Sequence, residues 1–178
     1  MRSLCGVLNA DRDRHLKFEE VLRYAAFPSF DRSQWDMSME KPQDEVFHVL
    51  LWLRKEKHVK KIMSLNVLDR MYCPHDERDI AFMARSFRVE KLDWRFLDMA
   101  ISYLTDENLT PSNSKLTARK APPERLTELR LYSSGKRAAV DHWLGQNGVN
   151  TLPNVRISYP SACLLTQWLR SSRSCIFT

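Results

Sequence analysis

The sequence predicts an α/β fold, a small parallel or mostly parallel sheet of about four strands with helices packed on it. Apolar residues recur at helical spacing in some segments and form short extended runs in others, and the two kinds of segment alternate along the chain. The expected strands begin at residues 59 and 89 in one pair and at residues 126 and 155 in the other. Separations of about 30 residues suit a strand, a crossover helix and a second parallel strand.

The predicted α/β domain spans residues 42–158, and its first half contains two helices and two strands. The first helix, within 42–57, places Val46, Val49, Leu50 and Leu53 on one face. The segment 59–68 is apolar on both sides, which predicts a strand covered on both faces. Asp76 is a typical N-cap for a second helix that runs to residue 87, and residues 89–94 form the next expected strand.

The second half begins with a short helix within 95–104 and a polar, proline-containing segment, 105–125, which predicts a mobile loop. A strand is expected over 126–132 and a turn over 133–135. A helix follows over 136–144, with Gly145 as its C-cap, and the last strand covers 155–158.

Outside this domain, residues 1–41 are expected to form an N-terminal helical segment, and residues 159–178 an irregular tail. The helix is suggested by five apolar side chains, Phe18, Val21, Leu22, Tyr24 and Phe27. A leucine-rich solenoid has a similar rhythm of strands, but its fixed pattern of Leu and Asn is not found, so the sequence favours an ordinary α/β sheet.

Charge and composition limit the class of protein. The net charge is +6, and no apolar run approaches the ~18 residues of a membrane span. The amino end lacks the h-region of a signal peptide, and the 4 cysteines show no CxxC spacing, so we expect a cytoplasmic protein with reduced thiols. The basic residues of the second half are scattered without interleaved aromatic residues, so we do not expect nucleic acid as a partner.

One turn carries a candidate anion site. Ser133, Ser134, Gly135, Lys136 and Arg137 follow an expected strand and open an expected helix. Free amides, hydroxyls and cations at such a place can bind phosphate, although the full GxxxxGK[ST] motif is missing. The alternative is that one of the serines only caps the helix.

Two other pairs of residues are candidates for chemical groups. Cys73 and His75 suggest a thiol nucleophile or a metal ligand, but no second pair of ligands is in register with them. Asp141 and His142 are neighbours on a helix, about 100° apart, so they cannot orient each other as a relay. We therefore predict no catalytic residue, no metal and no cofactor.

The segments Val59-Lys-Lys-Ile62, Val89-x-x-Leu92-x-Trp94 and Leu129-x-Leu131-Tyr-Ser-Ser-Gly-Lys-Arg-Ala-Ala-Val-Asp-His-Trp-Leu-Gly145, with Gly148-Val149, carry a resemblance. This stretch, about residues 42–157, resembles the non-catalytic N-terminal region of fungal proteins that carry a subtilisin-like serine peptidase domain. In that family the Asp, His and Ser triad lies in the later domain. The present chain contains no Asp-Thr-Gly, His-Gly-Thr or Gly-Thr-Ser motif, so no peptidase residue is carried over.

The resemblance implies a non-catalytic protein-interaction or regulatory module, whose partner is another protein or a peptidase domain. The alternative is a small enzyme domain that binds phosphate or a nucleotide through the turn 133–136. Sequence leaves the choice between them open, with enzyme activity the less favoured.

Overall fold

The computed structural model describes residues 17–28, 44–69, 73–114, 116, 126–152 and 155–158. These residues form a five-stranded sheet in which every pair of neighbouring strands is parallel, so the predicted α/β fold class is confirmed. The elements follow one another as β1 (Val21–Phe27), α2 (Glu45–Lys55), β2 (Lys61–Val67), α3 (Glu77–Ser86), β3 (Lys91–Trp94), α4 (Ile101–Thr105), β4 (Glu128–Arg130), α5 (Arg137–Leu144), the 3₁₀ helix η2 (Val149–Thr151) and β5 (Arg156–Ser158).

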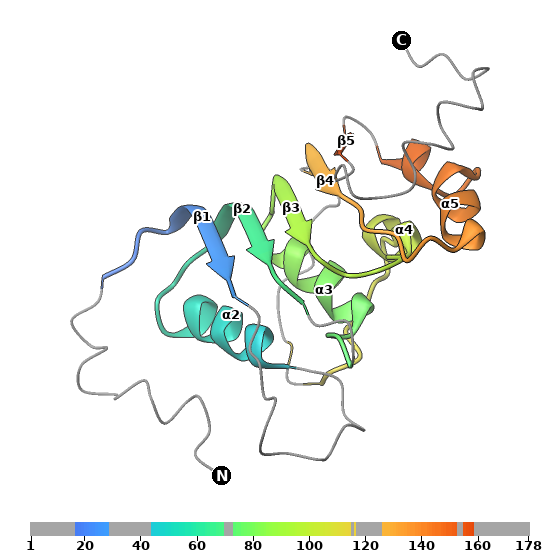
Figure 1. Ribbon diagram of the computed structural model, residues 1–178. Coiled ribbons are helices and arrows are strands. Elements are labelled where there is room, and N and C mark those ends of the chain that lie inside the picture. Colours follow the sequence, from blue (N-terminus) through green and yellow to red (C-terminus); the bar gives the residue numbers. More distant parts are fainter. Residues whose placement is uncertain are drawn as a thin grey trace.

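The strands lie in the sheet in the order β1-β2-β3-β4-β5, which is also their order in the chain. Each connection therefore steps one strand in the same direction, and right-handed crossovers then place every connecting helix on the same face. Figure 1 shows α2, α3, α4 and α5 together on one side of the row of strands. Helices and sheet enclose a single hydrophobic core between them.

The strands share a spacing of inward-facing side chains, apolar-x-x-apolar-x-apolar. It occurs as Leu22, Ala25 and Phe27; as Ile62, Leu65 and Val67; as Val89, Leu92 and Trp94; and as Leu126, Leu129 and Leu131. The pairing register aligns the middle positions, since Ala25 pairs with Leu65, Leu65 with Leu92, and Leu92 with Leu129. This is the strand part of the leucine-rich repeat pattern. The Asn that follows this spacing in leucine-rich repeats is absent, because Phe30, Arg70, Leu97 and Ser134 stand at that position, and unequal loops separate the copies.

The helices that the structure describes cover only one face of the sheet, so the prediction of a strand covered on both faces is wrong for this part of the chain. In β2, Leu65 and Val67 are buried against the helices, whereas Ser64 and Asn66 alternate with them and are only partly buried. The sequence pattern misled because Met63 adds an apolar side chain to a strand whose other outward positions are polar.

Two of the helix-to-strand turns are built alike. His58 follows α2 with φ of 57° and Arg88 follows α3 with φ of 51°, both in the left-handed region. In each turn the next residue is a buried valine, Val59 or Val89, whose N–H donates to a carbonyl near the end of the helix. At the start of α3, the Asp76 carboxylate accepts from the Arg78 and Asp79 N–H groups at 2.9 and 3.2 Å, which confirms the predicted N-cap.

The predicted N-terminal helical segment is wrong where the structure describes it, because Val21–Phe27 is strand β1. Short apolar runs fit either kind of element, and here the parallel pairing with β2 decides. Residues 1–16 and 29–41 of that segment lie outside the described residues, as does the tail 159–178.

The described part of the predicted mobile loop, 105–114 and 116, packs against the core. Leu109 and Leu116 are buried there, and the Asp79 carboxylate accepts from the Ser112 N–H at 2.7 Å. Among all the described residues, no helix has both the length and the apolar character needed to cross a bilayer.

Candidate functional site

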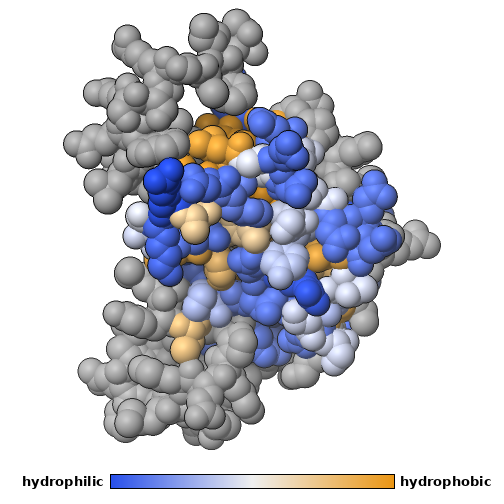
Figure 2. All heavy atoms as spheres, turned by 90° about the vertical axis from the view of Figure 1, so that its right-hand side faces the viewer, coloured by the Kyte–Doolittle hydropathy of each residue, from blue (hydrophilic) through white to orange (hydrophobic). Residues whose placement is uncertain are grey.

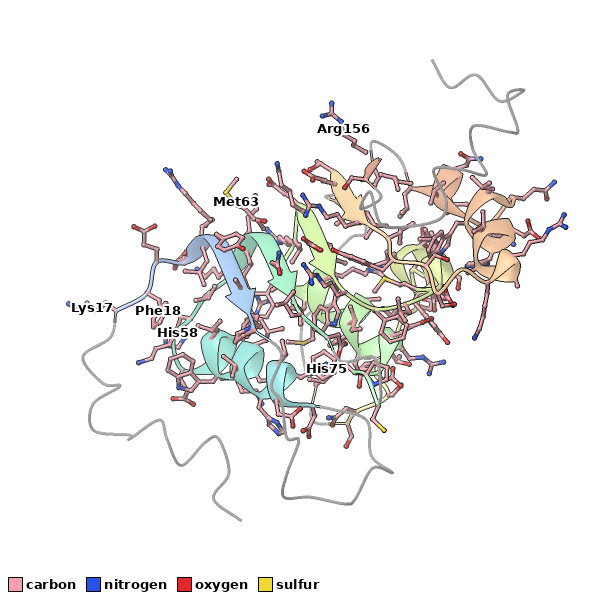
Figure 3. All side chains as sticks on the ribbon, viewed as in Figure 1. Lys17, Phe18, His58, Met63, His75 and Arg156 are labelled. Atoms are coloured by element: carbon pink, nitrogen blue, oxygen red, sulfur yellow. The ribbon has the colours of Figure 1, made fainter. Side chains whose placement is uncertain are left out.

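The face of the sheet opposite the helices is lined by polar side chains in regular cross-strand rows. We call it the open face and define it by two rows, Tyr24, Ser64, Lys91, Glu128 and Arg156, and Ala26, Asn66, Asp93, Arg130 and Ser158. No described helix lies on it (Figure 1). In Figure 3, Arg156 extends from β5 away from the helices.

Asp93 is the centre of the second row. Its carboxylate accepts from the Asn66 side-chain amide at 3.0 Å, from the Arg130 guanidinium at 3.0 Å and from the Tyr132 hydroxyl at 2.7 Å. The donors come from β2, β4 and the residues just after β4, so one carboxylate ties together three neighbouring parts of the sheet. Only 16% of the Asp93 side chain is exposed.

Asp93 also acts on Tyr132. Burial raises the pKa of the Tyr132 hydroxyl, and the hydrogen bond to Asp93 and the negative charge of Asp93 raise it further. Arg95 opposes this change in pKa, and its guanidinium lies 6.0 Å from the centre of the Tyr132 ring. Tyr132 therefore stays a neutral hydrogen-bond donor at neutral pH.

The first row alternates in charge. Lys91 in β3 pairs with Glu128 in β4 at 3.2 Å, and Arg156 in β5 lies next to Glu128 in the pairing register. The cations reach farther into solvent than the anions. The side chains of Lys91 and Arg130 are 59% and 49% exposed, whereas those of Glu128 and Asp93 are 29% and 16% exposed. The outermost atoms of the open face are thus mainly cationic.

The predicted anion-binding turn is engaged with the chain's own carboxylate. The Ser134 N–H donates to Asp98 at 2.8 Å, and the Ser134 hydroxyl also contacts that carboxylate. The Ser133 hydroxyl accepts from the Gly135 N–H at 3.0 Å. Asp98 therefore takes the place where an external anion would meet these donors.

The alternative interpretation, in which one of the serines caps helix α5, is wrong. The N-cap of α5 is Lys136, which makes no side-chain capping hydrogen bond. Arg137 pairs with Asp141 one turn later at 3.5 Å, and both side chains are largely exposed. Binding of a ligand at 133–137 stays a prediction.

His75 lies in the interior, between α2 and α3 in the view of Figure 3. Its Nδ1 lies 3.0 Å from an Asp69 carboxylate oxygen, its Nε2 accepts from the Val46 N–H at 3.4 Å, and the second Asp69 oxygen accepts from the Trp94 indole at 2.7 Å. With both ring nitrogens engaged, His75 joins the start of α2 to the end of β3. Within the described residues, no cluster of three or more His, Cys, Asp or Glu side chains is arranged to hold a metal ion.

His142 has a similar structural place. Its Nε2 accepts from the Ile101 N–H at 3.3 Å, at the first residue of α4. It therefore joins α5 to α4, and it does not approach Asp141 as a catalytic partner would.

Sequence reasoning missed every member of the open face as a site residue. The signal available was the alternation of polar residues with the apolar repeat, as in Glu128-Leu129-Arg130-Leu131. Recognition on the open face depends on these polar groups. Figure 2 views another side of the molecule, the α5 side, where hydrophilic side chains cover most of the surface and apolar ones gather near the top.

Comparison of the chain with protein-family models, with curated proteins and with solved structures finds no match.

Proposed function

We propose that this chain is a non-catalytic protein-interaction module that docks a partner protein or domain on its open face. The observation that supports this most is the sequential strand order, which leaves one sheet face without any of the described helices and presents polar side chains from every strand in register. Stacked units of this kind characteristically use such extended surfaces for binding.

The chemistry of the open face also supports binding over catalysis. Its charged groups pair with one another across the strands, Lys91 with Glu128 and Arg130 with Asp93. Catalysis of group transfer needs a nucleophile, a base and an orienting group that converge on one point. Asp93 instead accepts from donors on both sides along the row. Such a row suits a broad contact with another macromolecule.

The resemblance to the region that precedes a subtilisin-like peptidase in fungal proteins supports a finer proposal. In that context the module recruits or regulates a peptidase domain by surface contact. The partner is then a folded protein domain, and the chain contributes no residue to peptide-bond hydrolysis.

Site-specific cross-linking tests the docking surface. A photoreactive amino acid replaces Ser64 on the open face, and in the matched control it replaces Glu56, which is exposed just after α2 on the helix side. In an extract of the native cell, we expect one protein to be cross-linked from position 64 and not from position 56.

The cross-linked protein is then identified, purified and titrated against the whole chain. Saturable binding that Ser64→Arg abolishes, with an unchanged circular dichroism spectrum, supports docking on the open face. Equal cross-linking from both positions, or binding that Ser64→Arg leaves intact, contradicts it. A partner without a peptidase domain contradicts the peptidase context alone.

A further inference from the structure

We infer that the segment which binds the open face is an acidic peptide, in extended conformation, that crosses strands β3, β4 and β5. This inference rests on the proposed function and specifies the chemistry of the partner. The geometry that points to it is that the cationic side chains on this part of the sheet are more exposed to solvent than the anionic ones.

Three cations stand on three consecutive strands, Lys91 on β3, Arg130 on β4 and Arg156 on β5. Asp93 and Glu128 pair with the first two, but these carboxylates are recessed while the cationic side chains extend beyond them. Arg156 is exposed and forms no ion pair with any residue that the structure describes. A ligand that approaches the face therefore meets positive charge first.

The spacing of the cations sets the spacing of the ligand's charges. Neighbouring strands lie about 4.8 Å apart, so Lys91 and Arg156, two strands from each other, are separated by roughly 10 Å. An extended peptide in the polyproline II conformation advances about 3.1 Å per residue and has three residues per turn. Acidic side chains three residues apart then lie on the same side of the peptide, roughly 9 Å from each other, and match the two outer cations.

Guanidinium groups favour this ligand class. Arg130 and Arg156 carry guanidinium groups, planar cations of a kind that can bind a ligand's carboxylate through two parallel hydrogen bonds. Between the cations lie the Asp93 and Glu128 carboxylates, which repel a continuous run of negative charge. A nucleic-acid strand carries a phosphate at every nucleotide and cannot leave a gap there, whereas a peptide can place an uncharged residue at that point.

The test uses fluorescence anisotropy with the whole chain and a labelled 12-residue peptide of repeated Glu-Ser-Ser triplets. Peptides of repeated Lys-Ser-Ser triplets and a 12-nucleotide oligothymidylate are the comparison probes. We expect the acidic peptide to bind more tightly than both, and its affinity to fall as salt rises from 50 to 200 mM, since exposed charges are screened.

Charge variants locate the binding. Arg156→Glu is expected to weaken binding of the acidic peptide at least tenfold, and Arg130→Gln severalfold, while Arg156→Lys retains most of the affinity. The matched control is Lys55→Glu, the same change of charge at an exposed lysine on the helix side, and it should alter the affinity less than twofold. Circular dichroism verifies that each variant is folded.

Three outcomes overturn the inference. They are equal weakening by Arg156→Glu and Lys55→Glu, tighter binding of the oligothymidylate than of the acidic peptide, and no binding of the acidic peptide at millimolar concentration. If the partner found by cross-linking still docks on the open face in any of these cases, only the acidic chemistry fails. If that docking fails as well, the proposed function fails with it.

Discussion

Replacement of Asp93 by alanine removes the acceptor on which the second row of the open face depends. Asn66, Arg130 and Tyr132 all lose their hydrogen bond to this carboxylate. The bonds from Asn66 and Tyr132 contribute about 1 kcal/mol each to the free energy of unfolding. Arg130 is half exposed, so its ion pair adds only about 0.5 kcal/mol.

Asp93→Ala should therefore lower the free energy of unfolding by about 2.5 kcal/mol. For a chain of this size that corresponds to a decrease in Tm of about 5 to 10 °C. Urea denaturation followed by circular dichroism measures the first quantity and a thermal melt the second. Glu56→Ala, at an exposed position after α2, is the control and should change the free energy by less than about 0.5 kcal/mol.

The same site has a spectroscopic signature. Asp93→Asn removes the negative charge that raises the pKa of Tyr132, so this pKa should move down toward its ordinary value, and burial alone should then keep it raised. Carbon-13 NMR of labelled tyrosine resolves the titration of Tyr132 from that of the other tyrosines. A Tyr132 pKa that does not change, together with a loss of stability below about 0.5 kcal/mol in Asp93→Ala, would refute the assignment of Asp93 as the acceptor that joins the rows.

Four further changes probe the core, a close contact, a buried carboxyl and the turn 133–137. Phe87→Ala, at a ring that is 0% exposed, should cost about 3 to 5 kcal/mol in urea denaturation. Gly148→Ala should lower Tm, because a Cβ there would lie 2.1 Å from the Trp143 carbonyl oxygen, and Gly145→Ala, where the closest contact is 3.1 Å, should do so much less. Burial raises the pKa of Glu77, so the folded state favours its protonated form. The free energy of unfolding therefore decreases as the pH rises from the pKa of Glu77 in the unfolded state to its pKa in the folded state. Glu77→Gln should make this decrease smaller, as measured by urea denaturation at several pH values. Millimolar phosphate should leave Tm unchanged in a thermal melt, since the Asp98 carboxylate already holds Ser134.

Each of these expectations has a contrary result. A loss below about 1 kcal/mol in Phe87→Ala would place that ring outside the core. Equal decreases in Tm for Gly148→Ala and Gly145→Ala would contradict the close contact between position 148 and the Trp143 carbonyl. A Glu77→Gln variant with the same pH dependence of stability as the parent would mean that Glu77 has an ordinary pKa. Protection by phosphate that Lys136→Ala abolishes would support the anion-binding prediction for the turn.

Most of the fold could be predicted from the sequence, because strands and helices with a strong periodicity of apolar residues can be recognised from that pattern. The strand expected over 89–94 is β3 and the helix expected from Asp76 is α3, each within a few residues. β1 was missed because its apolar residues fit a helix as well as a strand, and its identity depends on pairing with β2, a contact that sequence spacing does not reveal.

The functional surface was harder to predict, for a physical reason. Asp93 and Arg130 lie 37 positions apart in the chain and become neighbours only through the register of β3 and β4. The residue types of the turn at 133–137 predict phosphate binding, yet the carboxylate that accepts from the Ser134 N–H belongs to Asp98, 36 positions away. The residue types therefore indicated which groups donate hydrogen bonds, but the carboxylates that accept them could be identified only from the fold.

The consecutive arrangement of the strands also affects how this protein folds and how such a chain can change in length over evolution. Each strand–helix unit mainly touches the units before and after it, so structure can nucleate at β2 and β3, whose partners are close in the chain, and spread outward to both edges. Duplicating an internal unit would lengthen the sheet without rewiring the existing pairs. The loops between units can likewise vary in length, as they already do, while the inward-facing residues of the strands stay in alignment.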